Sequence, residues 1–133
     1  MTPFRLKIVA PDKIFFDGET EQIIVKTTEG NVGILANHAK YVANLIAGPL
    51  KIKQEDGIFR VAAISSGAIS VGDNIVTILV NTIEWADEID IERAKRAEEV
   101  AREKIKSSES EKELDVATLK LKRALNRINI ASK

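Results

Sequence analysis

All seven glycines and all three prolines of this chain lie within its first 72 residues, so the remainder contains neither of the two strongest helix breakers. The hydrophobic period changes in the same region, from alternation before residue 85 to a three- or four-residue repeat after residue 90. We therefore place a domain boundary near residue 85. The expected organisation is one domain of residues 1–85 and a second of residues 86–133.

The first part is predicted to consist of short β-strands. Residues 4–8 read Phe-Arg-Leu-Lys-Ile, the alternation typical of a strand with one buried face. Similar segments follow at residues 22–27, 33–35, 50–53, 59–65, 68–71 and 75–80. Glu-Asp-Gly at 55–57 and Gly-Asp-Asn at 72–74 contain residues that tolerate positive φ and favour tight hairpins. Many short strands without intervening helices predict a β-sandwich or flattened barrel.

The second part is predicted to be an antiparallel pair of helices. A narrow stripe of small and apolar residues begins near Asp90 and is formed by Ile91, Ala94, Ala97, Ala101 and Ile105. A turn at residues 107–110 offers two capping boxes for a second helix, Ser108 with Glu111 or Ser110 with Glu113. That helix is expected to bury Leu114, Ala117, Leu121, Ala124, Leu125 and Ile128. The alanines bury little area, so we expect this hairpin to be conformationally labile.

Composition excludes several classes of function. There is no cysteine and only one histidine, which removes disulfides, thiolate sites and imidazole clusters. The chain contains no phosphate loop and no Ser-His-Asp or Cys-His arrangement, so we expect a non-catalytic protein without a metal. No stretch approaches the roughly 20 apolar residues of a membrane span, so direct membrane insertion is not expected. The N-terminus does not read as a signal peptide, and a cytoplasmic location is expected.

Net charge differs between the two parts. Residues 1–88 carry 8 basic and 11 acidic side chains, whereas residues 89–133 carry 12 and 9. Within residues 115–133, five bases stand against Asp115 alone, a net charge of +4. These bases are Lys120, Lys122, Arg123, Arg127 and Lys133. A run of this kind is equally typical of a solvated helix face.

Four motifs, in order along the chain, resemble those of the epsilon subunits of bacterial F-type ATP synthases. Residues 30–39 read Gly-Asn-Val-Gly-Ile-Leu-Ala-Asn-His-Ala, where the family commonly has Pro-Gly before the histidine. The others are Ser-Gly-Ala-Ile-Ser-Val at 66–71, Asn-Ile-Val-Thr-Ile-Leu at 74–79 and Ile-Asp-Ile-Glu-Arg-Ala at 89–94. The last is similar to the opening of the first C-terminal helix in ATP-binding members. Asn37 replaces the family's glycine, and asparagine also tolerates positive φ.

The resemblance implies a non-catalytic subunit of the central stalk. It would bind the gamma subunit and the membrane ring of c subunits, with the loops around Asn31 and His38 lying toward ring or gamma. The complex would be peripheral, on the cytoplasmic face of the cell membrane. In the family the hairpin also extends toward the alpha and beta subunits and inhibits ATP hydrolysis. Lys120 and Lys122 would belong to this basic arm, and the choice of proton or sodium would be made in the ring.

ATP is the regulatory ligand that the resemblance implies, with no other cofactor. Its carried-over contacts are Glu84, Ile89, Asp90, Arg93, Ala94, Arg123 and Arg127. Arginine offers planar, charge-assisted donors to phosphates, and Asp90 and Glu84 offer acceptors for adenine or ribose. Arg123 and Arg127 are one helical turn apart and share a face.

Each of these residues also has a structural interpretation. Residues 30–33 alone are typical of a hairpin turn, and His38 of a loop residue. Asp90 is suited to cap a helix, and Arg93 to be a solvated charge. A free-standing β-sandwich module for a ligand or nucleic acid is the alternative function. Neutral net charge and the lack of a basic-aromatic platform argue against nucleic acid.

Overall fold

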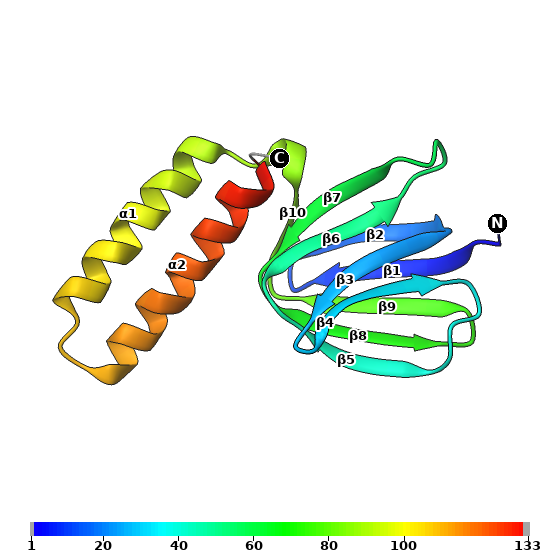
Figure 1. Cartoon of the computed structure of the whole chain (residues 1–133), viewed down its shortest axis with the longest axis horizontal. Helices are drawn as coiled ribbons and strands as arrows, with labels where there is room; N and C mark the ends of the chain where they lie inside the picture. The colour runs from blue at the N-terminus through cyan, green and yellow to red at the C-terminus, as the bar shows by residue number, and fades with distance from the viewer. Residues whose placement is uncertain (1, 132–133) are drawn as a thin grey trace. The chain divides into compact units, whose positions relative to one another are not determined.

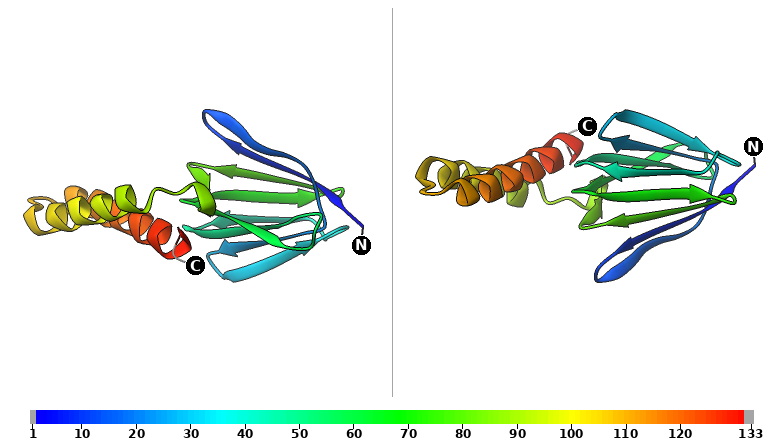
Figure 2. Two further views of the ribbon diagram at one scale, coloured as in Figure 1. Left: turned by 90° about the horizontal axis from the view of Figure 1, so that it is seen from above. Right: turned by 90° about the horizontal axis from the view of Figure 1, so that it is seen from below.

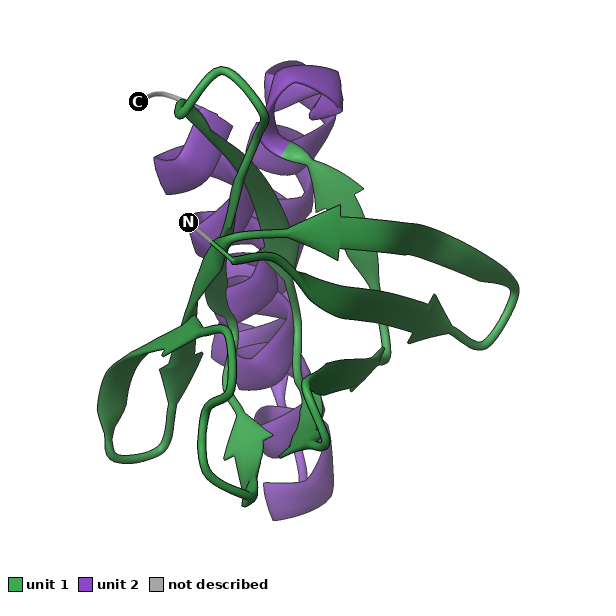
Figure 3. Cartoon of the chain, turned by 90° about the vertical axis from the view of Figure 1, so that its right-hand side faces the viewer, with its two compact units in different colours: residues 1–85 green, residues 86–133 purple. Residues whose placement is uncertain are grey.

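The computed structural model describes residues 2–131 and divides the chain into two compact units, residues 1–85 and residues 86–133 (Figure 3). The first unit is a β-domain and the second a pair of helices joined by a short turn (Figure 1). The predicted fold class, a β-sandwich or flattened barrel followed by an antiparallel helical hairpin, is confirmed.

Ten strands make up the first unit. They are β1 (Phe4–Ala10), β2 (Lys13–Thr20), β3 (Gln22–Thr27), β4 (Gly30–Leu35), β5 (Tyr41–Leu45), β6 (Gly48–Lys53), β7 (Phe59–Ile64), β8 (Gly67–Gly72), β9 (Ile75–Val80) and β10 (Ile83–Trp85). Their order is β10-β7-β6-β3-β5-β8-β9-β1-β2, with β4 paired to β3. All pairs are antiparallel except β1 with β9, which lie parallel.

Turn residues join the strands as predicted. Gly57 has φ +85° between β6 and β7, and Asp73 and Asn74 have φ +52° and +60° between β8 and β9. Asn37, in the loop after β4, also has positive φ, at +61°. Its substitution for glycine therefore preserves the left-handed backbone at this position.

The two end strands of the sheet approach each other through side chains. The rings of Phe15 on β2 and Trp85 on β10 lie 4.6 Å apart. The Thr20 hydroxyl at the end of β2 donates to the carbonyl oxygen of Lys53 at 2.7 Å. The sheet is thereby nearly closed, and Figure 2 shows its strands from two further sides.

Alternation along the strands builds one hydrophobic core in this unit. On β1, Phe4, Leu6 and Ile8 are buried while Arg5 and Lys7 are exposed. Buried members come from the other strands too, including Ile23, Val25, Ile34, Leu50, Ile52, Ile64, Ile69, Val76 and Ile78. Full burial of one such side chain stabilises the fold by about 1.5 to 3 kcal/mol.

The sequence patterns missed β2, β5 and β10. On β2 the side chains are mostly exposed or half-buried, so no buried face repeats with period two. β5 is short, and β10 contains three residues. β5 and β10 are fixed by pairing with strands distant in the sequence, which a local pattern does not record. β2 is fixed by pairing with its sequence neighbour β1.

The second unit begins with a turn of 3₁₀ helix, η1 (Ala86–Glu88), followed by α1 (Ile91–Ser107) and α2 (Glu111–Ala131). Figure 1 shows the two helices side by side and antiparallel. Four alanines are buried, Ala94 and Ala101 on α1 and Ala117 and Ala124 on α2.

Some burial predictions for the helices were wrong. Ala97 is exposed, and Leu114 and Leu125 retain 40% and 39% of their accessible surface. Ile130, which was not singled out, is buried. A helical period identifies a face, but the neighbours of its edge positions depend on tertiary packing.

Residues 2–131 contain no helix that is both long and apolar enough to cross a membrane.

Candidate functional site

The first helix begins at a capped turn. Asp90 has extended backbone angles, and its Oδ1 accepts a hydrogen bond from the Arg93 amide at 3.1 Å. The Ala94 amide then donates to the Asp90 carbonyl at 3.0 Å. A carboxylate at this position satisfies an otherwise unpaired amide and favours the positive end of the helix dipole. The cap thus determines where α1 begins.

The second helix begins at the second of the two predicted capping boxes. The Ser110 hydroxyl accepts from the Glu113 amide at 3.1 Å. Glu113 Oε2 accepts from the Glu109 amide, also at 3.1 Å, rather than from Ser110 itself. The Ser108 hydroxyl instead donates to the Lys104 carbonyl at 2.6 Å, so it terminates α1.

A groove of about 390 Å³ runs between the two helices, and we call it the cationic groove. Six of its ten lining residues carry positive charge, and the other four are alanine or valine. The lining consists of Arg93, Arg96, Ala97, Val100, Ala101 and Lys104 on α1, with Lys120, Arg123, Ala124 and Arg127 on α2. No acidic residue lines it among the part of the chain that the structure describes.

The alanines determine the shape of the groove. Ala101 and Ala124 are nearly fully buried and allow the helices to approach closely. The longer cationic side chains then project from the rims on both sides, at i, i+3 and i+4 spacings that keep them on one face.

Several cationic side chains of the groove, though not Arg127, are uncompensated by the part of the protein that the structure describes. Within residues 2–131, Arg93, Arg96 and Lys120 have no carboxylate partner. The Arg123 Nε is buried and, within the same residues, donates no hydrogen bond. An unpaired buried donor costs about 1 to 3 kcal/mol, so this guanidinium favours an acceptor supplied from outside the protein.

Three of the residues singled out as ATP contacts, Arg93, Arg123 and Arg127, line this groove together. Asp90, Ile89 and Ala94 do not line it. Asp90 caps the helix, Ile89 is half-buried before it, and Ala94 is buried in the helix interface. Glu84 lies in the β-domain, on β10, where it pairs with Ala63.

Arg96 and Lys104 also line the groove but were not singled out from the sequence. A signal for them exists, because residues 93, 96, 100 and 104 follow three- and four-residue steps along α1. Lys120, assigned to the basic arm, lies in the groove, whereas Lys122 is exposed and does not line it. Lys133 lies outside the described residues.

Asn31 and His38 do not come together. Asn31 is exposed near the start of β4, opposite Lys26 on β3, and His38 follows the other end of that strand. The strand rise separates Asn31 from the end of β4 by about 13 Å. The His38 ring packs edge-on against Tyr41 at 5.8 Å, and its Nδ1 lies 2.7 Å from the Ala39 carbonyl oxygen.

The arrangement of the groove suits binding rather than catalysis. Guanidinium and ammonium groups recognise phosphate and carboxylate oxygens, with arginine making two parallel hydrogen bonds where geometry allows. The lining contains no histidine, carboxylate, hydroxyl or thiol side chain, and its only groups of a kind that can act as nucleophile or base are the ammonium groups of Lys104 and Lys120. The chemistry of the groove is therefore that of a polyanion receptor.

Comparison with known proteins assigns both units. Residues 3–86 match the family described as ATP synthase, Delta/Epsilon chain, beta-sandwich domain. Residues 87–132 match ATP synthase, Delta/Epsilon chain, long alpha-helix domain.

Curated relatives agree over the whole length. The ATP synthase epsilon chain of Ruminococcus albus is 49% identical, covering 100% of this chain and 99% of the relative. That of Caldanaerobacter subterraneus subsp. tengcongensis is 44% identical over 98% of this chain and 94% of its own. The sodium ion specific epsilon chain of Propionigenium modestum is 35% identical, with coverages of 98% and 95%.

A solved structure agrees as well. A chain of the Euglena gracilis mitochondrial ATP synthase superposes with a TM-score of 0.79 at 28% identity, covering 91% of this chain and 76% of that one. The chain therefore belongs to the epsilon-chain family of F-type ATP synthases, the non-catalytic subunits of the central stalk.

Proposed function

We propose that this subunit couples ion-driven rotation to ATP synthesis through its β-domain and restrains ATP hydrolysis through its helical hairpin. The β-domain is the part that binds gamma and the c ring, and the loops at Asn31 and His38 contact different partners because they lie at opposite ends of β4. The similar Euglena chain comes from an assembly of F1 and a c-ring, which supports these partners. The complex works at the cytoplasmic face of the cell membrane, with this chain peripheral.

ATP is the ligand of the cationic groove in this proposal. The single observation that carries it is the convergence of Arg93, Arg123 and Arg127 on one groove without acidic lining. The three arginines bind the triphosphate, and the buried Arg123 Nε donates to a phosphate oxygen. For the base and ribose, the contacts that the family resemblance implies remain our prediction, namely Glu84, Ile89, Asp90 and Ala94.

Electrostatics explains why the ligand would control the hairpin. Without an anion, six cationic side chains face one another across a groove held by a small alanine interface, which weakens the compact form. A triphosphate removes this repulsion only when both helices are in place. ATP therefore shifts the equilibrium toward the compact hairpin by its differential affinity for that form.

The opened hairpin supplies the inhibitory arm. Its second helix carries Lys120, Lys122, Arg123 and Arg127, which are released from the groove or remain exposed when the helices separate. We infer that they meet an acidic surface of the alpha and beta subunits and obstruct rotation in the hydrolysis direction. Opposite charge steers this encounter and makes it weaken with salt.

Arg93→Ala is the sharpest test of ATP binding. Loss of a charge-assisted contact typically costs about 1.5 to 3 kcal/mol, so the variant should bind ATP roughly 10- to 150-fold more weakly by titration calorimetry. Arg102→Ala is the matched control, since Arg102 lies on the same helix, pairs with Glu98 and does not line the groove. It should bind ATP like the unmodified chain.

Equal weakening in the two arginine variants would show that only overall charge matters. No heat or spectral change with the unmodified chain at millimolar ATP would exclude ATP as the ligand. Asp90→Ala is a poorer probe, because it also removes the cap of α1, at about 1 kcal/mol.

A further inference from the structure

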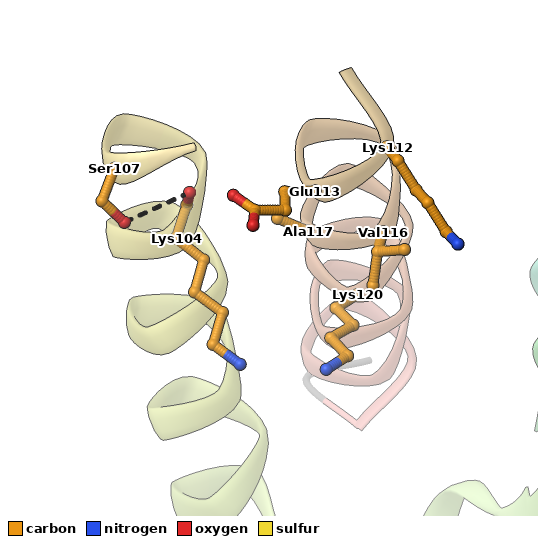
Figure 4. Close-up of a pocket in the computed structure, with 7 residues that line it drawn as sticks. All are labelled: Lys104, Ser107, Lys112, Glu113, Val116, Ala117 and Lys120. Atoms are coloured by element: carbon orange, nitrogen blue, oxygen red, sulfur yellow. Dashed lines mark hydrogen bonds between the residues drawn. The ribbon is translucent and has the colours of Figure 1, made fainter. Parts of the chain in front are cut away.

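A second hollow of about 440 Å³ lies toward the turn between the helices (Figure 4). Its lining residues are Lys104, Ser107, Lys112, Glu113, Val116, Ala117 and Lys120. Two of these, Lys104 and Lys120, also line the cationic groove. The two hollows therefore adjoin at these two lysines, and we call the pair the channel.

The hollow is built around one half-exposed valine. Lys112, Val116 and Lys120 follow one another at i+4 steps, so they form a row along α2. Figure 4 shows Lys104 and Lys120 extending toward each other from the two helices. Val116, 48% exposed, lies between Lys112 and Lys120 on α2, and in Figure 4 the Lys112 side chain extends on the side of Val116 away from Lys104.

The acidic residue of the lining is already engaged. Glu113 Oε2 accepts from the Glu109 amide in the cap of α2, which commits this carboxylate to the turn. The negative charge of Glu113 lowers the local positive potential, but no ion pair joins Glu113 to Lys104, Lys112 or Lys120 within residues 2–131.

The channel is longer than a triphosphate needs. Helical rise separates Arg93 from Ser107 by about 21 Å along α1. The four arginines of the cationic groove, Arg93, Arg96, Arg123 and Arg127, already offer at least one guanidinium for each phosphoryl group of a triphosphate. Lys104, Lys112 and Lys120 remain for anionic groups farther along the same channel.

We propose that the hollow at the turn is a second phosphate subsite, so that the hairpin binds linear condensed phosphates with chains longer than three units. The first phosphates occupy the arginines, and the following ones lie over Val116 between Lys104, Lys112 and Lys120. The proposal uses the groove of the proposed function as its first subsite. It does not require that ATP itself be the physiological ligand.

Two substitutions of nearly equal exposure test this subsite. Val116→Glu places a carboxylate among the three lysines, whereas Leu119→Glu, at a position 47% exposed, adds the same charge outside both linings. Glutamate suits a helix interior at both sites. The full chain is titrated calorimetrically with inorganic tripolyphosphate and with long-chain polyphosphate at one ionic strength.

The unmodified chain should bind the long chain more tightly than tripolyphosphate. Val116→Glu should weaken long-chain binding roughly 5- to 20-fold through like-charge repulsion, removing most of that gain. Leu119→Glu should change it less than about 2-fold, because its charge is distant and screened. Tripolyphosphate, held by the arginines, should be nearly unaffected by either variant.

The proposal is wrong if chain length gives no gain in affinity, or if the two glutamate variants weaken long-chain binding equally. If Val116→Glu loses the helical circular dichroism of the unmodified chain, a second pair of variants makes the same comparison. Lys112→Gln removes a charge from the hollow, and Lys106→Gln is its control because Lys106 lines neither hollow. If the chain does not bind ATP, but Val116→Glu still weakens long-chain polyphosphate binding, the second phosphate subsite is supported and ATP is rejected as the ligand of the cationic groove.

Discussion

The side chain of Asn74 holds together three segments that are far apart in the sequence. Its Oδ1 accepts from the Asn37 amide at 2.7 Å, and its Nδ2 donates to the Pro3 carbonyl at 3.2 Å. Its own carbonyl accepts from the Arg5 amide at 3.2 Å. Asn74 thus positions the loop that contains His38, although its local role is that of a turn residue with φ +60°.

Asn74→Ala should destabilise the β-domain by about 1 to 3 kcal/mol, through two lost hydrogen bonds and a left-handed backbone that alanine disfavours. Urea unfolding measures this loss. Asn74→Gly keeps the backbone freedom and should cost less than alanine, whereas Asn74→Asp keeps the acceptor for Asn37 and loses only the donor. Equal midpoints for all three variants and the unmodified chain would contradict this role.

Sequence reasoning identified residues whose role is local and missed those whose partners are distant. Asp90 as a helix cap and Asn37 at positive φ follow from one or two neighbouring residues, and both predictions were confirmed. The bridge from Asn74 to Pro3 spans 71 positions, so no local pattern signals it. Arg96 and Lys104 were missed for a different reason: their spacing was visible, but solvated helix charges have the same spacing.

At the level of elements, the sequence alone did not decide which capping box forms at the turn between the helices. Two capping boxes were open, and Ser110 with Glu113 is the one formed. Periodicity predicted both helices and most strands, because one face of each repeats with its own period. It did not predict β2, whose neighbour in the sheet rather than its own alternation fixes it.

Removal of the cap on α2 should weaken the hairpin measurably. Ser110→Ala removes the acceptor of the Glu113 amide and should cost about 1 kcal/mol of hairpin stability. Thermal unfolding followed by helical circular dichroism would show the loss. Ser110→Asp is the control, because it keeps a capping acceptor at the same position and should unfold close to the unmodified chain. A transition that alanine leaves unchanged would mean that other contacts hold the turn.

The basic arm makes a second prediction at this level. Replacing Lys120, Lys122, Arg123 and Arg127 together by alanine should raise ATP hydrolysis by the assembled complex, because the charge that steers the arm is removed. Hydrolysis is compared with a complex in which three bases of α1 outside the groove lining are replaced instead, namely Lys95, Arg102 and Lys106. If the unmodified arm inhibits and both variant complexes hydrolyse ATP at the same rate, the charge of the arm does not cause the inhibition.

At the level of the complete chain, the β-domain has the features of an independent folding unit. Its hydrophobic core is built entirely from residues before the helices, and its strands pair only with one another. A chain that ends at Glu88 should therefore keep its β-type circular dichroism, unfold cooperatively and bind gamma. Loss of the β signal in this fragment would show that the helices are needed for the fold.

The regulatory role of the hairpin is best tested by ATP hydrolysis in the purified complex, with the full chain or with the chain truncated after Glu88. We expect the same subunit composition in both and faster hydrolysis with the truncated chain, with the difference shrinking as ATP rises and closes the hairpin. Salt should also reduce the difference, because the arm acts through charge. Equal hydrolysis rates at low ATP and low salt, in complexes of matched composition, would refute the claim that residues 89–133 restrain the enzyme.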